Sequence, residues 1–323
     1  MKKILVTGGA GFIGSHFINL ILDENKDIEV INFDNLTYAA NLNNVNTSKK
    51  HTFIEGNIGN EDDLNNLFSR YSFDAVINFA AETHVDKSIE NPFIFTETNL
   101  LGFQKLFYKA MDNEVKRFIQ ISTDEVYGPN ENSEIFDENS SLKPDNPYSV
   151  SKAGADMIVK SAMNTFGYKG IIVRSSNNYG INQYPEKLIP LSIKRLISGE
   201  KIKLYGDGNQ KRDWLSVTDN VNIIKNILFS GIDGEIYNIC TGVEKKNIDV
   251  AKLIIKSLNE LLGTKYSEAE DIEFVEDRKG HDYRYTMSNY KVMREIKVPG
   301  FNDFDSGIND VVRHYLAKYG VLK

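Results

Sequence analysis

Residues 2–17, KKILVTGGAGFIGSHF, join a short apolar run to a cluster of glycines. Residues 4–6 predict a buried strand, and Gly8, Gly11 and Gly14 follow it directly. Glycines at this spacing permit a tight turn and let a pyrophosphate approach the N-terminus of the next helix. The same glycines would also suit a turn with a purely structural role, so the neighbouring sequence has to separate the two interpretations.

A carboxylate at the end of the next strand favours a cofactor site. Residues 29–33, EVINF, predict this second strand, and Asp34 follows it, twenty residues beyond Gly14. A carboxylate at this distance from the glycines hydrogen-bonds the ribose hydroxyls of a dinucleotide and repels the 2′-phosphate of NADP. We therefore predict that the cofactor is NAD.

Strands and helices continue to alternate along the first half of the chain. Further strands are predicted at 51–55, at 74–79 and from 117, with helices at 61–70 and 91–112. Five βα units with a glycine-rich first turn indicate an α/β fold, a Rossmann-type doubly wound parallel sheet.

Residues 117–128, RFIQISTDEVYG, place a hydroxyl and two carboxylates where the central strand ends. Open α/β sheets bind their ligands along this edge, which makes Thr123, Asp124 and Glu125 candidate functional residues. An ordinary turn is the alternative, because Thr and Asp are common turn formers and Gly128 follows.

The pentad YSVSK, residues 148–152, decides between these alternatives. Asn146 and Pro147 predict the cap and first position of a helix, so that Tyr148 and Lys152 lie on one helical face. A lysine ammonium near a phenol favours the phenolate and lowers the pKa of the tyrosine, which makes a usable base. The sequence thus predicts a catalytic site.

Composition restricts the class of protein. The 323 residues are 41% hydrophobic and 26% charged, as expected for one large or two ordinary globular domains. The net charge of −7 does not support nucleic-acid binding, and the five scattered histidines show no metal-ligand spacing. A single cysteine, Cys240, the absence of a signal peptide and the lack of a long apolar span predict a cytoplasmic protein without a membrane partner.

Together, TGGAGFIGSH, TDEVYG and YSVSK resemble the extended short-chain dehydrogenase/reductase superfamily. Within it the chain closely resembles the dTDP-glucose 4,6-dehydratases. The segments that carry this resemblance are 34–45, 78–89, 187–190, 203–217 and 277–285. The superfamily motifs are shared with epimerases and decarboxylases, whereas the consecutive Thr-Asp-Glu is specific to enzymes that perform an elimination.

The resemblance implies a lyase that converts dTDP-glucose to dTDP-4-keto-6-deoxyglucose and water, a step of deoxysugar biosynthesis. Tyr148, bonded by Thr123, would remove the C4 hydroxyl proton, Glu125 would remove the C5 proton and Asp124 would protonate the departing C6 hydroxyl. The order of acid and base comes from the family. UDP-glucose 4,6-dehydratase, another sugar-nucleotide epimerase or decarboxylase, and a non-catalytic NAD-binding protein remain alternatives.

The resemblance also implies a division of the chain and a set of contacts. Residues 1–176, completed by parts of 215–240, would form the NAD-binding domain, and 177–323 an interleaved, smaller α/β sugar-nucleotide domain. Helices at 91–112 and 147–166 would form a homodimer through a helix bundle.

The implied cofactor contacts are Gly8, Gly11, Phe12, Ile13, Gly14, Asp34, Asn35, Leu36, Thr37, Asn57, Ile58, Ala80, Ala81, Glu82, Thr98, Tyr148, Lys152 and Asn178. The implied substrate contacts are His84, Thr123, Asp124, Glu125, Asn177, Lys187, Leu188, Lys203, Tyr205, Arg212, Asn247, Asp277, Arg278, His281 and Tyr285. No metal is expected. Asn57 departs from the family pattern, which has Asp at this position.

Overall fold

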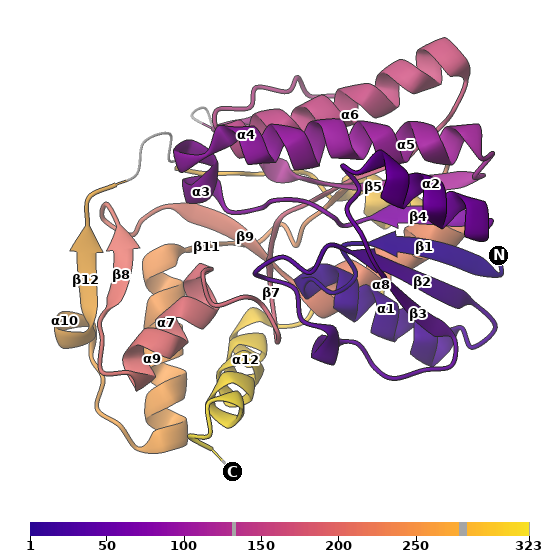
Figure 1. The fold of residues 1–323 in the computed structure, drawn as a ribbon. Coiled ribbons are helices and arrows are strands. Elements are labelled where there is room, and N and C mark those ends of the chain that lie inside the picture. Colours follow the sequence, from indigo (N-terminus) through magenta and orange to yellow (C-terminus); the bar gives the residue numbers. More distant parts are fainter. Residues whose placement is uncertain (131–133, 278–282, 323) are drawn as a thin grey trace.

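A seven-stranded parallel sheet forms the centre of the computed structural model, which describes residues 1–130, 134–277 and 283–322 (Figure 1). The strand order is β10-β6-β5-β4-β1-β2-β3, which confirms the predicted doubly wound sheet. The strands are β1 (Lys3–Thr7), β2 (Glu29–Asp34), β3 (His51–Glu55), β4 (Ala75–Asn78), β5 (Arg117–Thr123), β6 (Ile171–Ser175) and β10 (Ile236–Ile239).

Helices cover both faces of this sheet, which is why its central strands are apolar on both sides. One face is packed by α1 (Phe12–Glu24), α8 (Val217–Ser230) and α11 (Tyr290–Glu295). The opposite face is packed by α2 (Glu61–Arg70), α5 (Phe103–Asp112) and α6 (Pro147–Phe166). The order of the strands reverses between β1 and β4, so the carboxyl ends of these strands flank a crevice of the kind that binds ligands.

The helix predicted over 91–112 is divided in the structure. It consists of α4 (Pro92–Phe95), the π-helical turn η2 (Thr96–Gly102) and α5. Apolar periodicity does not separate a π-helical turn from an α-helix, because one widened turn alters the pattern by a single residue. Such turns are frequent at functional sites.

A second group of elements lies at the side of the main sheet (Figure 1). It contains a three-stranded sheet, β11 (Glu244–Lys246), β9 (Lys211–Ser216) and β7 (Asn177–Tyr179), and a two-stranded sheet, β12 (Ile272–Val275) and β8 (Ile202–Tyr205). Its separate apolar core is built by α7 (Leu188–Ile197), α9 (Asn247–Leu262) and α12 (Phe304–Lys318). Shorter turns are η1 (Leu42–Asn44), α3 (Val85–Glu90), η3 (Asp124–Tyr127) and α10 (Glu268–Asp271).

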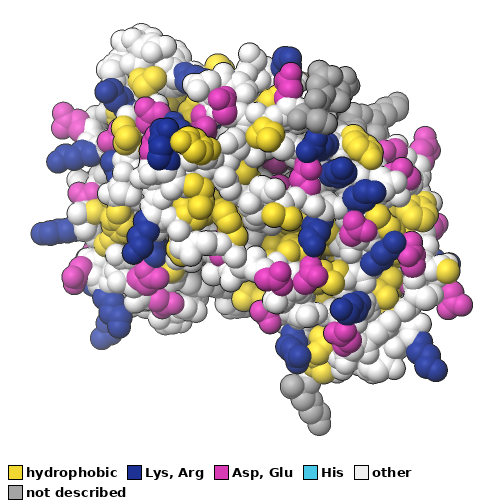
Figure 2. All heavy atoms as spheres, turned by 180° about the vertical axis from the view of Figure 1, so that it is seen from behind, with side chains coloured by type: hydrophobic (Ala, Val, Ile, Leu, Met, Phe, Trp, Pro, Cys, Tyr) yellow, Lys and Arg dark blue, Asp and Glu magenta, His cyan; other side chains and the backbone are white. Residues whose placement is uncertain are grey.

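Acidic and basic side chains are interspersed on the face shown in Figure 2 and do not separate into areas of one sign. Among the residues described, no helix is both long enough and apolar enough to cross a membrane.

Candidate active site

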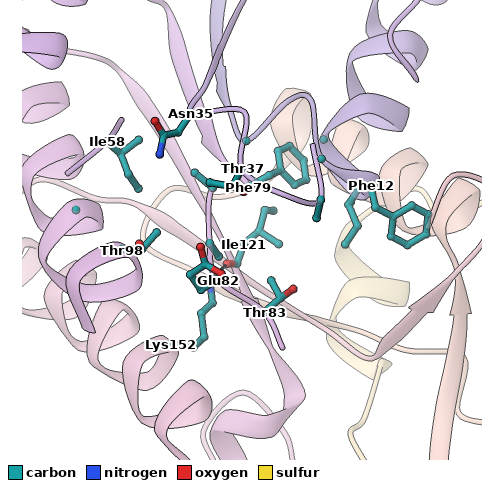
Figure 3. Close-up of a pocket in the computed structure, with 18 of the residues that line it drawn as sticks. Phe12, Asn35, Thr37, Ile58, Phe79, Glu82, Thr83, Thr98, Ile121 and Lys152 are labelled. Atoms are coloured by element: carbon teal, nitrogen blue, oxygen red, sulfur yellow. Dashed lines mark hydrogen bonds between the residues drawn. The ribbon is translucent and has the colours of Figure 1, made fainter. Parts of the chain in front are cut away.

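A cavity of about 930 Å³ opens at the carboxyl edge of the main sheet. Its walls include every predicted cofactor contact except Leu36. Figure 3 shows Phe12 of α1, Asn35 after β2 and Lys152 of α6 around this one space. Predicted cofactor contacts from six separate segments of the first half of the chain, and Asn178 from the second half, therefore meet there, although their binding roles remain predictions.

The glycine turn is packed so closely that a side chain at Gly8 or Gly14 would collide with the backbone. A Cβ on Gly8 would lie 2.5 Å from the backbone nitrogen of Ala80, and one on Gly14 would lie 2.3 Å from the Gly8 carbonyl oxygen. Gly8 also has a φ of +69°, in the left-handed region that favours glycine. The N-terminus of α1 has no side-chain cap, so its backbone N–H groups are suited to an anion such as a pyrophosphate.

Backbone hydrogen bonds hold the Asp34 carboxylate at the wall of the cavity. One oxygen accepts from the Ala10 N–H at 2.9 Å and the other from the Leu36 N–H at 2.8 Å. Burial raises the pKa of Asp34, and the two hydrogen bonds oppose this shift. The Leu36 side chain does not line the cavity. Leu36 has a φ of 48°, and its backbone N–H is the group that donates to the Asp34 carboxylate. Asn57 does line the cavity, and its Oδ1 accepts from the Gly59 N–H at 2.7 Å.

The Thr-Asp-Glu residues form the start of the turn η3. The Thr123 hydroxyl donates to Asp124 Oδ1 at 3.0 Å and accepts from the Glu125 N–H at 3.3 Å. Burial, followed by the negative charge of Glu125, raises the pKa of Asp124 to about 7. Glu125 Oε2 accepts from Asn146 Nδ2 and from the Tyr285 hydroxyl, each at 3.4 Å. Asp124 can therefore be a neutral carboxyl group beside the less buried carboxyl group of Glu125.

Tyr148 and Lys152 project from the first turns of α6, which begins as the sequence predicts. Asn146 and Ser149 form a reciprocal capping box at the start of the helix, with the Ser149 N–H donating to Asn146 Oδ1 at 2.9 Å. Lys152 Nζ donates to the Ile121 carbonyl at 2.6 Å, and burial lowers the pKa of Lys152 to about 8.

The prediction of a lowered pKa for Tyr148 is wrong for the protein chain by itself. Burial and then the charge of Glu125 raise the pKa of Tyr148, while a hydrogen bond with Thr123 opposes the shift. The physical reason is burial, which removes the hydration of a phenolate. The Lys152 ammonium, which was expected to favour the phenolate, donates to the Ile121 carbonyl, and burial lowers its own pKa.

The predicted substrate contacts fall into two groups. Asn177 and Lys187 line the cavity together with Thr123, Asp124 and Glu125. The others that the structure describes do not line it, namely His84, Leu188, Lys203, Tyr205, Arg212, Asn247, Asp277 and Tyr285. Arg278 and His281 lie outside the described residues.

Most of the second group is gathered around residues 205–212. Gln210 Nε2 donates both to the Tyr205 carbonyl and to Asp277 Oδ2 at 3.2 Å, and the Gln210 carbonyl accepts from the Asn247 N–H at 3.0 Å. The Arg212 guanidinium lies over the Tyr285 ring at 4.6 Å. Because the Tyr285 hydroxyl contacts Glu125, this group is joined to the carboxylate pair.

The remaining three residues have different surroundings. His84 caps α3, where its Nδ1 accepts from the Lys87 N–H at 3.4 Å, and burial lowers the pKa of its ring. Leu188 is the first residue of α7. Lys203 is half exposed and lies 4.0 Å from Glu273 on the neighbouring strand.

Sequence reasoning missed much of the cavity wall. The missed residues lie after β3, on η2 and α5, and in the loop before α7, and include Gly56, Gly59, Asn60, Glu61, Glu97, Leu101, Lys105, Gln183, Tyr184 and Glu186. The residues after β3 carried a usable signal, because the carboxyl end of every parallel strand meets the same edge. The structure shows no group of three or more His, Cys, Asp or Glu that could hold a metal ion within its described ranges.

Comparison with known proteins agrees with this geometry. The family described as GDP-mannose 4,6 dehydratase matches residues 5–311. A dTDP-glucose 4,6-dehydratase of Shigella flexneri is 41% identical over 336 residues, which cover 98% of this chain and 93% of that protein. The low-salt glycan biosynthesis protein Agl12 of Haloferax volcanii is 42% identical, over 97% of this chain and 98% of its own.

The solved structures that this chain resembles include a dehydratase and an epimerase. DesIV of Streptomyces venezuelae, a dTDP-glucose 4,6-dehydratase crystallised with NAD, superimposes with a TM-score of 0.92 at 40% identity, covering 98% of each chain. A UDP-glucose 4-epimerase of Thermotoga maritima reaches a TM-score of 0.89 at 28% identity, covering 98% of this chain and 99% of its own. The fold alone therefore does not separate a dehydratase from an epimerase.

The position of Asp34 leads to a prediction about cofactor choice. Asp34→Ala should weaken NAD binding and reduce discrimination against NADP, because it removes the ribose acceptor and the charge that repels a 2′-phosphate. Dissociation constants for both dinucleotides, measured by calorimetry, check this. Asp310→Ala, an exposed acidic position on α12, is the control. Parent-like affinities in the Asp34 variant would show that Asp34 is not the ribose ligand.

Proposed function

Because this chain belongs to the GDP-mannose 4,6-dehydratase family, we propose that it catalyses the 4,6-dehydration of dTDP-glucose with NAD as cofactor. The product is dTDP-4-keto-6-deoxyglucose, and water is released. The observation that carries the proposal is the meeting of Thr123, Asp124 and Glu125 with Tyr148 and Lys152 in one cavity that also contains a dinucleotide cradle.

The residues of this cavity fit NAD. The glycine turn and the N-terminus of α1 would hold the pyrophosphate, Asp34 the adenosine ribose, and Asn57 and Ile58 the adenine. When bound, NAD supplies the hydride acceptor for C4 of the sugar and the hydride donor for C6, and its positive nicotinamide ring favours the phenolate of a neighbouring tyrosine.

Tyr148 is the base for the first step. It receives the proton of the C4 hydroxyl as that carbon becomes a ketone, while Thr123 holds the phenolic oxygen. Lys152, fixed on the Ile121 carbonyl at the next turn of α6, adds a positive charge that favours the phenolate once the cavity is filled.

The carboxylate pair serves the elimination. The C4 ketone acidifies the C5 hydrogen, and Glu125 removes it. Asp124 holds a proton up to about pH 7 and delivers it to the departing C6 hydroxyl, which leaves as water. Glu125 returns its proton to C5 as C6 is reduced. One proton then passes from Tyr148 to Asp124 to restore the starting state, and Thr123 is hydrogen bonded to both residues.

We further propose that residues 1–176, completed by parts of 215–240, act as the NAD-binding unit and that 177–323 bind the sugar nucleotide. The inclusion of β10 in the main sheet supports this division. Arg212, Lys187 and the group around residues 205–212 would contact the nucleotide diphosphate and base. The buried, unpaired thiol of Cys240 supports a cytoplasmic location, because reducing compartments keep cysteines free.

A homodimer is proposed through α4 and α6, which lie side by side in Figure 1. Phe93 is 76% exposed, and Val150 and Met157 are 54% and 43% exposed. Val150 and Met157 are seven residues apart and therefore share one face of α6. Exposed apolar side chains on neighbouring helices are typical of a protein interface.

The proposed activity is tested with dTDP-glucose and UDP-glucose in separate incubations. We expect dTDP-4-keto-6-deoxyglucose from the first, identified by mass spectrometry, with little turnover of the second. No added reductant should be needed and no free NADH should accumulate, because the hydride that leaves C4 returns to C6. Stoichiometric release of NADH would indicate a simple dehydrogenase, and a C4-inverted sugar would indicate an epimerase.

Two variants distinguish the proposed role of Glu125 as the base from that of Asp124 as the acid. Glu125→Gln should retain C4 oxidation, seen as enzyme-bound reduced nicotinamide, and lose C5 exchange and dehydration together, by roughly a hundred- to ten-thousand-fold. Asp124→Asn should retain C5 exchange and slow only the loss of the C6 hydroxyl. Single-turnover absorbance and mass spectrometry of the sugar in deuterated water measure these steps. Parent-like deuterium incorporation in Glu125→Gln would transfer the role of base to Asp124.

The same pair predicts a pH dependence. Burial and the Glu125 charge raise the pKa of Asp124 to about 7, so the acid is present below that pH and is lost above it. Elimination, measured in single turnover, should therefore decline as the pH rises through about 7. The decline should be absent in Asp124→Asn, whose side chain does not titrate. A decline that persists in that variant would have to come from another group.

The interface is tested by placing a charge on α6. Met157→Asp should shift the protein from dimer to monomer in sedimentation velocity, because an unpaired carboxylate would be buried at the interface. Ile232→Asp, at a position 56% exposed after α8, should leave the dimer intact. A parent protein that sediments as a monomer would contradict the proposal.

A further inference from the structure

The carboxylate pair stands on a very short element. The turn η3 has only four residues, Asp124–Tyr127, between β5 and Gly128. A single turn of 3₁₀-helix has little stability of its own. Tyr127 is the last residue of this turn. The position of the two carboxylates relative to Tyr148 therefore depends on the contacts that hold Tyr127.

Tyr127 is held by two buried hydrogen bonds. Its hydroxyl accepts from Arg174 Nη1 at 2.7 Å and donates to Asn238 Oδ1 at 2.8 Å. The Arg174 guanidinium also lies over the Tyr127 ring at 4.8 Å, and Phe136 stacks on that ring at 5.4 Å. Tyr127 is 1% exposed and Arg174 and Asn238 are fully buried, so these bonds have no competition from water.

The same arginine reaches the helix that carries the base. Arg174 Nε donates to Asp156 Oδ2 at 2.9 Å, and both side chains are fully buried. Asp156 lies four residues after Lys152, one turn further along the same face of α6. Its charge raises the pKa of Lys152 and so partly offsets the lowering by burial. A continuous chain of contacts therefore runs from α6 through β6 to η3.

Stability alone does not account for this chain of contacts. A buried ion pair is often no more stabilising than well-packed apolar residues of the same volume, because both charges lose their hydration. Buried polar networks do fix geometry, since their groups have few alternative partners. Here the network joins α6, two turns beyond Tyr148, to the end of the turn that carries Asp124 and Glu125.

We infer that Tyr127 and Arg174 are positioning residues, which hold the elimination pair in register with the oxidation base through Asp156. The inference rests on the proposed 4,6-dehydration and deepens it. Oxidation at C4 uses groups on α6 and at the end of β5, whereas elimination also uses the turn. Loosening the turn should therefore harm elimination far more than oxidation.

Tyr127→Phe is the test variant, because it keeps the ring and its packing and removes only the hydroxyl. The Arg174–Asp156 ion pair remains in it. Tyr237→Phe is the matched control, since Tyr237 is also fully buried, on β10. Its hydroxyl accepts from the Ile232 N–H at 3.1 Å and is also hydrogen bonded to the Glu295 side chain.

Single-turnover kinetics should separate the two steps. In Tyr127→Phe we expect C4 oxidation near the parent rate and C5 exchange and dehydration slower by roughly tenfold to a hundredfold, as for a small misplacement of reacting groups. Bound reduced nicotinamide should accumulate as a result, with the KM for the sugar nucleotide unchanged. Tyr237→Phe should keep the parent ratio of the two rates.

Amide hydrogen exchange provides a readout that does not depend on activity. In Tyr127→Phe, faster exchange should be confined to residues 124–128, while α6 keeps parent-like protection. Equal slowing of oxidation and elimination, or faster exchange across α6 as well, would show a general structural role and overturn the inference. So would a parent-like ratio of rates. A parent protein without dehydratase activity would refute the proposed function, whereas the exchange pattern would still test the anchoring of the turn.

Discussion

Parallel pairing of β1 with β4, and of β4 with β5, is the constraint on which the rest of the site depends. Parallel strands end at the same edge, so the glycine turn, the segment after β4 and the Thr-Asp-Glu turn open into one cavity. No residue of these three segments is a neighbour of the others in sequence. The sheet thus provides a fixed frame, and the chemistry resides in the loops that leave it.

Burial then sets the protonation of the catalytic groups. It shifts Asp124 toward its neutral acid form and Lys152 toward its neutral amine, and it holds Tyr148 as a phenol. The closeness of Glu125 adds to the shifts of Asp124 and Tyr148 because like charges repel. The positive nicotinamide ring of NAD would favour the phenolate in such a site, which suits a reaction that starts only after the cofactor is bound.

Side chains from the second half of the chain also reach the cavity and the carboxylate pair. Tyr285 joins Arg212 to Glu125, and Lys187 Nζ donates to the Thr83 carbonyl at 2.9 Å beside the cavity. Through these contacts the residues proposed to hold the nucleotide are connected to the residues proposed to transform the sugar. The buried Arg174 makes a similar connection within residues 1–176, where it links β6 to both η3 and α6.

The sequence by itself determined the elements whose signals are local. The strand at 51–55 and the helix at 61–70 have the predicted bounds, and α6 begins at Pro147 behind its Asn146 cap, because alternation, periodicity and capping depend on neighbouring residues. The glycine spacing and Asp34 likewise indicated a cofactor cavity, since that geometry lies within one βαβ unit. Only the tertiary structure decided the rest. It showed the π-helical turn at 96–102, the raised pKa of Tyr148 and the chain from Asp156 to Tyr127, since each depends on contacts and burial among residues far apart in sequence.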